Sequence, residues 1–256
     1  MRKLLAGLGV SLFITACAGG AVPGIMMAAP AAVTATSPNI LAAIADPRRP
    51  AADRDRDALR HPAEIAAFTG IEPGWRIADV GPGGGYYTRI LSVAVGDAGR
   101  VYGIDRAGTA ERPRPLTAVA GEYSNITHLT DGYVNWTIAE PLDAIFISQI
   151  YHDFYLPAFG FDVPALNRKL FAALKPGGVL LIIDHAAAEG SPITVTDTLH
   201  RIDRAQVIAD LTAAGFVLES ESQVLRNPAD NHSLRVFEGD IRGHTDQFVL
   251  RFRRPG

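Results

Sequence analysis

A glycine-rich segment lies between an apolar run and a helical pattern, and few folds accommodate such a junction. Residues 79–85 read Asp-Val-Gly-Pro-Gly-Gly-Gly. The apolar run Arg76–Val80 leads into them, and an amphipathic stretch over Tyr86–Val95 follows. Glycines here let the backbone turn sharply and let a ligand approach it without meeting a Cβ atom. The segment therefore predicts a strand, a ligand-facing turn and a helix whose first N–H groups can bind an anionic group.

Short apolar runs alternate with helical stretches along most of the remaining chain. Each run is about five to seven residues long, the length of a buried strand in a parallel sheet. After Arg76–Val80, the predicted strands are Arg100–Asp105, Ile126–Thr130, Leu142–Ser148 and Val179–His185. The predicted helices are Pro62–Phe68, Tyr86–Val95, Pro115–Tyr123 and Val163–Leu174. Strand and helix in alternation indicate an open, doubly wound sheet.

The alternation stops near the end of the chain. A helix over Asp203–Ala214 ends at Gly215 and leads into a strand over Phe216–Gln223, and a polar loop then leads into a last strand over Thr245–Arg253. A strand entered without a crossover helix should run antiparallel to its neighbour. The predicted fold class is therefore α/β: a Rossmann-like, doubly wound, seven-stranded and mostly parallel sheet with an antiparallel last strand.

An acidic residue, Asp105, ends the second predicted strand, twenty residues beyond Gly85. Its carboxylate can accept hydrogen bonds from both hydroxyls of a ribose. Three details favour S-adenosyl-L-methionine over a nicotinamide as the cofactor. The turn is Asp-x-Gly-x-Gly-x-Gly rather than Gly-x-Gly-x-x-Gly, no second domain is predicted for a hydride acceptor, and a dinucleotide would need room for its pyrophosphate.

Three motifs give the chain a family likeness: Ile71–Gly74, the turn at 79–85, and Leu174-Lys175-Pro176-Gly177-Gly178 before a strand. Together they resemble class I S-adenosylmethionine-dependent methyltransferases. More narrowly, the chain resembles a bacterial group of predicted methyltransferases with N-terminal signal sequences. The segments that carry this narrower likeness are Pro82–Leu91, Tyr151–Asp153, Asp184-His185, Leu199–Asp203, Leu225–Pro228 and Arg242–Phe252.

The resemblance implies a set of cofactor-binding residues. Asp79, Gly81, Gly83 and Gly85 would line the methionine end, Asp105 would hold the ribose, Asp131 would lie near the adenine amino group, and Ser148 and Gln149 would lie under the sulfonium. Asp131 precedes Gly132, so the pair also fits an ordinary turn. Gly84 stands where many relatives have Ser or Thr, which removes one side-chain contact and leaves the turn intact.

Histidines supply the candidate general bases. A sulfonium methyl is already activated, so the main task is to position a nucleophile, and a base helps when the acceptor is a hydroxyl or a protonated amine. Four histidines are predicted at the carboxyl ends of the strands: His152, His185, His200 and His232. We expect His152 to be the base, with Asp153 beside it. His185, next to Asp184, is the second candidate.

Other features of the sequence give less support for a role in binding or catalysis. No metal ion is predicted, because the histidines show no tight spacing. Tyr86, Tyr87 and Tyr151 could form an aromatic wall for a ring substrate, and they fit equally well as packed side chains. Trp75 and Trp136 are interpreted as packing residues.

The predicted function is methyl transfer from S-adenosylmethionine to a small-molecule acceptor. The alternative is a non-catalytic ligand-binding protein on the same fold. A protein carboxyl methyltransferase is a further alternative, because Gly83–Thr88 and Gly99–Tyr102 resemble the isoaspartyl repair enzymes. It is disfavoured because the other hallmarks of that family are not found in the chain.

The N-terminus resembles an export signal. Arg2 and Lys3 precede an apolar run over Leu4–Ala16, which predicts a signal peptide at residues 1–18. Ile14–Cys17 also resembles a lipobox, so membrane attachment is expected only through a lipidated Cys17. An Ala- and Pro-rich linker over 19–52 and a methyltransferase domain over 53–256 are predicted to follow.

These features predict a protein of the periplasm or cell envelope, or a cytoplasmic one if translation starts later, at Met26 or Met27. The formal net charge of the chain is −3 and no basic residues cluster along it, so nucleic acid is not an expected partner.

Overall fold

The computed structural model describes residues 36–109 and 112–256. The predicted signal peptide, Cys17 and the first part of the predicted linker, residues 19–35, lie outside this range. Within the described ranges, no helix combines the length and the apolar character needed to cross a membrane.

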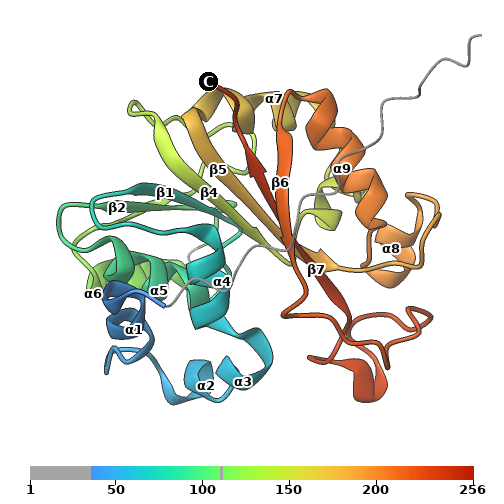
Figure 1. Cartoon of the computed structure of the whole chain (residues 1–256), viewed down its shortest axis with the longest axis horizontal. Helices are drawn as coiled ribbons and strands as arrows, with labels where there is room; N and C mark the ends of the chain where they lie inside the picture. The colour runs from blue at the N-terminus through green and yellow to red at the C-terminus, as the bar shows by residue number, and fades with distance from the viewer. Residues whose placement is uncertain (1–35, 110–111) are drawn as a thin grey trace, which may run out of the picture.

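A single twisted sheet runs through the molecule (Figure 1). Its seven strands are β1 (Arg76–Val80), β2 (Arg100–Ile104), β3 (Ile126–Leu129), β4 (Leu142–Ser148), β5 (Leu174–His185), β6 (Val217–Ser222) and β7 (Gln247–Arg253). The strand order is β3-β2-β1-β4-β5-β7-β6. β1 to β5 are parallel, while β7 is antiparallel to both β5 and β6. The predicted fold class is confirmed.

Helices cover both faces of the sheet and bury two apolar layers (Figure 1). One layer packs under α4 (Pro62–Thr69), α5 (Tyr86–Val95) and α6 (Leu116–Glu122). The other packs under α7 (Val163–Ala173) and α9 (Arg204–Ala213). Because both faces are covered, the central strands carry mostly apolar side chains on both faces, which explains why apolar runs rather than an alternating pattern marked them in the sequence.

One strand differs from its prediction at the start. β5 begins at Leu174 rather than Val179, because Leu174 pairs with Leu142 at the edge of β4 before a register shift. The Lys175–Gly178 segment is therefore part of an irregular strand and not only a turn before one.

The structure contradicts the predicted linker between residues 36 and 52. This segment holds α1 (Pro38–Ile44) and the start of α2 (Ala51–Arg54), and α3 (Asp57–Arg60) follows. Ile40 and Ala43 are buried against α5, and the Asn39 side chain donates a hydrogen bond to the Ala94 carbonyl oxygen at 2.9 Å. A helix of only seven residues has little intrinsic stability, so the packing against α5 holds it in place and composition alone gave no sign of it.

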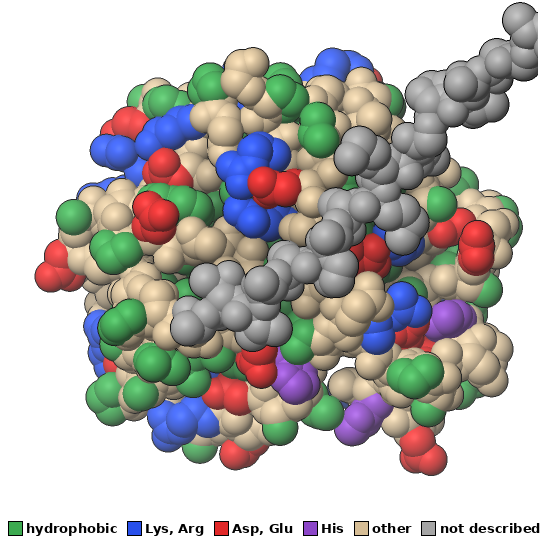
Figure 2. Space-filling view, viewed as in Figure 1, with side chains coloured by type: hydrophobic (Ala, Val, Ile, Leu, Met, Phe, Trp, Pro, Cys, Tyr) green, Lys and Arg blue, Asp and Glu red, His purple; other side chains and the backbone are tan. Residues whose placement is uncertain are grey.

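Three short elements complete the described chain: η1 (His152–Tyr155), α8 (Val195–Leu199) and η2 (Gly239–Ile241). On the face shown in Figure 2, acidic and basic side chains are interspersed and no broad basic surface is visible.

Candidate active site

A cavity of about 380 Å³ lies beyond the carboxyl ends of β1 and β4. The strand order reverses between these two strands, and open α/β sheets bind ligands at such a switch point. Its lining residues are Arg56, Arg60, Asp79, Gly81, Pro82, Gly83, Gly84, Tyr86, Tyr87, Arg106, Arg114, Tyr133, Ser148, Gln149, Ile150 and Asp153. The predicted residues Asp79, Gly81, Gly83, Ser148, Gln149 and Asp153 are among them.

The glycine-rich turn forms one wall of this cavity. Gly81 has a φ of +74°, and a Cβ there would lie 2.1 Å from a side-chain carbon of Ile150. A Cβ on Gly83 or Gly84 would meet no atom within 4 Å, so these two glycines leave open space over the turn. Gly85 differs, because a Cβ there would press on Leu116 and other packed side chains. Its role is therefore packing and turn geometry rather than contact with the cavity.

Asp79 is the penultimate residue of β1, and its side chain is almost completely buried. One carboxylate oxygen accepts a hydrogen bond from the Thr88 hydroxyl at 2.6 Å. Burial raises the pKa of Asp79 to about 6, although the Thr88 hydrogen bond and the charge of Arg60 act in the opposite direction. The carboxyl group therefore titrates close to neutral pH.

Asp105 lies just beyond β2 and is fully buried. Arg114 contacts its carboxylate and itself lines the cavity, so Arg114 stands between Asp105 and the open space. Asp131 is exposed and is not on the cavity wall, which does not favour its predicted place beside the adenine.

Gln149 follows β4 and connects two distant parts of the chain. Its backbone has a left-handed φ of 61°, which is uncommon for a residue other than glycine. Its Oε1 accepts a hydrogen bond from Arg60 of α3, and its Nε2 donates to Oε1 of Gln247 in β7 at 2.9 Å. The predicted position of Gln149 on the cavity wall is therefore fixed by side chains from both ends of the domain.

Basic and aromatic side chains near the N-terminus form the outer wall. The guanidinium groups of Arg56 and Arg60 lie 4.9 and 4.7 Å from the centre of the Tyr86 ring. The Tyr86 hydroxyl donates to Asp57 at 2.6 Å. Neither arginine was predicted as a site residue: the charges alternate over residues 53–57, which include Arg56 and fit an ordinary solvated helix start, and Arg60 lies outside any motif.

The predicted bases His152 and His185 do not line the cavity. His152 is buried between two carboxylates: its Nδ1 lies 2.7 Å from Asp184 Oδ1, and its Nε2 lies 3.2 Å from Asp153 Oδ1. Burial opposes charge on His152, but the two carboxylates outweigh it and raise its pKa to about 10. This geometry argues against His152 as the base.

His185, the second predicted base, is partly buried. Burial lowers the pKa of His185 to about 4, and Nδ1 lies 2.6 Å from the Thr245 hydroxyl.

The three tyrosines of the predicted aromatic wall lie in different places. Tyr86 and Tyr87 line the cavity, whereas Tyr151 is fully buried in the core.

Comparison with known proteins identifies the family of this chain. Residues 57–217 match the family described as protein-L-isoaspartate(D-aspartate) O-methyltransferase (PCMT), which is more than half of the chain. The chain belongs to this family. The prediction of an S-adenosylmethionine-dependent methyltransferase is thereby confirmed at the level of family and fold.

Individual relatives resemble only part of the chain. The protein-L-isoaspartate O-methyltransferase of Triticum aestivum is 32% identical over 119 residues, which are 44% of this chain and 46% of that protein. Protein-L-isoaspartate O-methyltransferase 1 of Arabidopsis thaliana is 33% identical over 119 residues, with the same two coverages. The chain thus spans about half the length of the curated relatives it matches.

Solved structures show the same fold at lower sequence identity. A SAM-dependent methyltransferase from Aquifex aeolicus matches with a TM-score of 0.55 and 21% identity, covering 78% of this chain and 92% of that one. Aeropyrum pernix fibrillarin with natively bound S-adenosyl-L-methionine matches with a TM-score of 0.52 and 18% identity, covering 77% and 76%.

The family match corrects one sequence-based judgement. The isoaspartyl methyltransferases were disfavoured because their hallmarks were not found beyond Gly83–Thr88 and Gly99–Tyr102. That judgement was wrong, since the matched region includes both segments and continues to residue 217. The narrower likeness to a bacterial signal-sequence group stays a prediction.

Proposed function

We propose that this protein transfers a methyl group from S-adenosylmethionine to a carboxylate oxygen, and that the acceptor is an isoaspartyl residue of a peptide or protein. The observation that carries the proposal is the charge of the cavity wall. Arg60 and Arg106 line the cavity, and neither forms an ion pair with an acidic side chain within the described part of the chain. Two cationic groups without a carboxylate partner suit anionic ligands.

The residues around the cavity fit the cofactor. Open space lies over Gly83 and Gly84, and the buried carboxylate of Asp79 faces the same cavity, where it can pair with the ammonium of the methionine end. Asp105 can accept the ribose hydroxyls once Arg114 moves away from it. The charge of Arg60 acts on Asp79, so Arg60 lies at the methionine end of the cavity and is assigned to the carboxylate of the cofactor, which leaves Arg106 for the acceptor.

The wall chemistry favours an acceptor that needs no deprotonation. The sulfonium supplies an already activated methyl group when the cofactor is bound. A carboxylate is already an anionic nucleophile at neutral pH, so this chain has only to hold its oxygen in line with that methyl. Neither His152 nor His185 lines the cavity, which leaves hydroxyl and amine acceptors without the predicted base.

The acceptor class can be tested with a matched pair of peptides. The full chain is incubated with isotope-labelled S-adenosylmethionine and either an isoaspartyl peptide or the same peptide with a normal aspartate. We expect label on the isoaspartyl peptide only, as a methyl ester that releases methanol under mild alkali. Label on small carboxylic acids instead would restore the predicted small-molecule acceptor, and label stable to alkali would contradict carboxylate transfer.

A variant pair separates acceptor binding from cofactor binding. Arg106→Ala should raise KM for the acceptor about tenfold, since one charge-assisted contact is lost, with cofactor affinity changed much less. Arg168→Ala removes an exposed arginine of α7 on the other face of the sheet and serves as the control. Cofactor binding without transfer to any acceptor would favour the non-catalytic alternative.

A further inference from the structure

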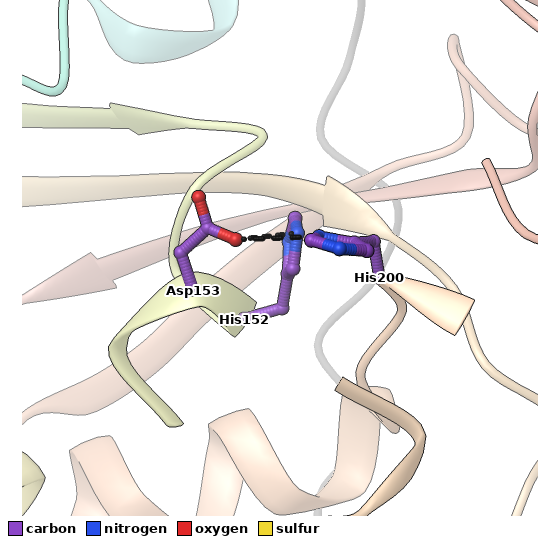
Figure 3. Close-up of side chains that lie close together, drawn as sticks. All are labelled: His152, Asp153 and His200. Atoms are coloured by element: carbon purple, nitrogen blue, oxygen red, sulfur yellow. Dashed lines mark ion pairs between the residues drawn. The ribbon is translucent and has the colours of Figure 1, made fainter. Parts of the chain in front are cut away.

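Three side chains from two separate turns meet beside the cavity (Figure 3). His152 and Asp153 begin η1, and His200 follows α8. Asp153 Oδ1 lies 3.2 Å from His152 Nε2 and 3.5 Å from His200 Nδ1, and all three atoms lie within 4.8 Å of one another. The three potential ligand atoms are therefore close enough together to contact one ion.

We propose that His152, Asp153 and His200 bind a divalent transition-metal ion, with Zn²⁺ as the probe. Two imidazoles and one carboxylate suit first-row transition ions. Zinc bonds to such atoms are about 2.0–2.1 Å long, so neighbouring ligand atoms of a tetrahedral site are about 3.3 Å apart. The two separations from Asp153 Oδ1, 3.2 and 3.5 Å, lie on either side of that value.

A buried carboxylate orients the first of these ligands. Asp184 is fully buried and accepts hydrogen bonds from the His152 ring Nδ1 and from the His152 backbone N–H, both at 2.7 Å. A histidine that binds a metal commonly donates its other ring N–H to a carboxylate in this way, which fixes the ring and directs Nε2 at the ion. Nε2 carries a proton while His152 is charged, so the ion must displace that proton to bind. Asp184 is therefore a positioning residue for His152.

The proposed carboxylate ligand, Asp153, has one buried oxygen without a hydrogen-bond partner among the described residues. Asp153 Oδ1 is buried and accepts no hydrogen bond of good geometry within the described residues, although both histidine nitrogens are near. A buried polar atom without a hydrogen bond is costly, and a cation between the three atoms would satisfy it. With three protein ligands the ion keeps an open position, as in catalytic zinc sites, and Asp153 also lies on the cavity wall.

One neighbour competes with the ion. Arg235 Nη2 lies 2.9 Å from His200 Nε2, so in this arrangement the second ring nitrogen of His200 accepts a hydrogen bond and Nδ1 carries the proton. Metal binding at Nδ1 requires the proton to move to Nε2 and Arg235 to leave. Arg235 is exposed and can do so.

The proposed metal site does not depend on methyl transfer. It also runs against the sequence expectation of no metal ion, which considered spacing along the chain only. His200 is 48 residues from His152 in the sequence, and in the fold the centroids of their rings lie 5.4 Å apart.

The site can be tested by titrating the full, untagged chain with Zn²⁺ alone after treatment with a chelator. We expect one ion per chain, with the affinity reduced at least about tenfold in Asp153→Asn and in His200→Asn. Asparagine tolerates the left-handed backbone that His200 has at a φ of 53°, so the second variant should fold. Thermal melting without metal checks this for each variant.

Two further variants make the result specific. Arg235→Ala should tighten Zn²⁺ binding about threefold, because a competing cation is removed. His244→Ala, which removes an exposed histidine outside the cluster, should leave binding unchanged. Absence of one-to-one binding, or binding that survives both ligand substitutions, would overturn the proposal. Co²⁺ absorption typical of tetrahedral coordination, lost in the same two variants, would support it whether or not a methyl acceptor is found.

Discussion

Arg114 holds both carboxylate oxygens of Asp105, with Nε 2.8 Å from Oδ2 and Nη2 2.7 Å from Oδ1. Asp105 is fully buried, whereas the Arg114 side chain is 27% exposed. The oxygens that Arg114 occupies are the ones expected to accept the ribose hydroxyls. Arg114 and the cofactor therefore compete for one carboxylate.

This competition predicts opposite effects for the two partners. Asp105→Ala should weaken binding of S-adenosylhomocysteine at least about tenfold, because the buried acceptor is lost. Arg114→Ala should strengthen it by up to about fivefold, since a partly exposed ion pair contributes up to about 1 kcal/mol. Titration calorimetry measures both, with the exposed Arg112→Ala as control. Weaker binding in Arg114→Ala would mean that Arg114 contacts the cofactor itself.

The pKa of Asp79, raised to about 6 by burial, predicts a pH-dependent affinity. The ionised carboxylate attracts the ammonium of the cofactor, so affinity should fall as the pH drops through about 6 and the group gains a proton. Binding at pH 5 is expected to be about tenfold weaker than at pH 7.5. Asp79→Asn should bind weakly with little change between these two pH values. A pH dependence kept in that variant would assign the effect to another group.

The same group has the opposite effect on the stability of the free protein. A folded-state pKa above the ordinary value means that folding favours the protonated form, so the free energy of unfolding falls as pH rises from about 4 to about 6. Asp79→Asn should therefore stabilise the chain at pH 7.5 by about 2–3 kcal/mol. Denaturant unfolding tests this, with Asp97→Asn as an exposed control. Equal stability of wild type and Asp79→Asn would contradict the raised pKa.

Helix α1 offers a direct test of the corrected linker. Ile40 is 2% exposed and Leu41, its neighbour in the same helix, is 54% exposed. Ile40→Ala should lower the free energy of unfolding by about 2–4 kcal/mol, because it leaves a cavity against α5. Leu41→Ala should change it by less than about 0.5 kcal/mol. Equal, small effects would return the segment to a flexible linker.

Alanine substitutions at two glycines can separate the effect of steric crowding from that of backbone strain. Gly81 and Gly74 both have positive φ values, +74° and +84°, but only at Gly81 would a Cβ collide with a neighbour. Gly74→Ala should cost about 1–2 kcal/mol from the left-handed backbone alone. Gly81→Ala should cost more, because Ile150 must move, and should also weaken cofactor binding. Similar unfolding midpoints and similar affinities for the two variants would contradict the observed close approach.

The sheet could be predicted from the sequence because its determinants are local. β1, α5 and β4 have the predicted ends, since apolar runs, glycines and prolines mark where strands and helices stop. Helix α1 was missed because tertiary contacts of Ile40 and Ala43 hold it, and these contacts have no signature in a short Ala-rich segment.

The site could be predicted only where it follows the strand ends. Asp79, Ser148 and Gln149, predicted to bind the cofactor, all lie on the cavity wall because topology brings parallel strand ends together. Arg60 reaches the cavity from a separate helix, and His200 reaches Asp153 from a turn 47 residues away. Contacts of this kind depend on how loops fold back over the sheet, which periodicity does not encode.

Gln149 has a consequence for how the protein matures. It bonds to Arg60, 89 residues earlier, and to Gln247, 98 residues later. Strands β1 to β5 can pair while the chain is still being synthesised, but the wall around Gln149 stays incomplete until β7 has emerged from the ribosome. Ribosome-bound nascent chains that end before Gln247 should therefore contain most of the sheet and yet lack the finished cavity.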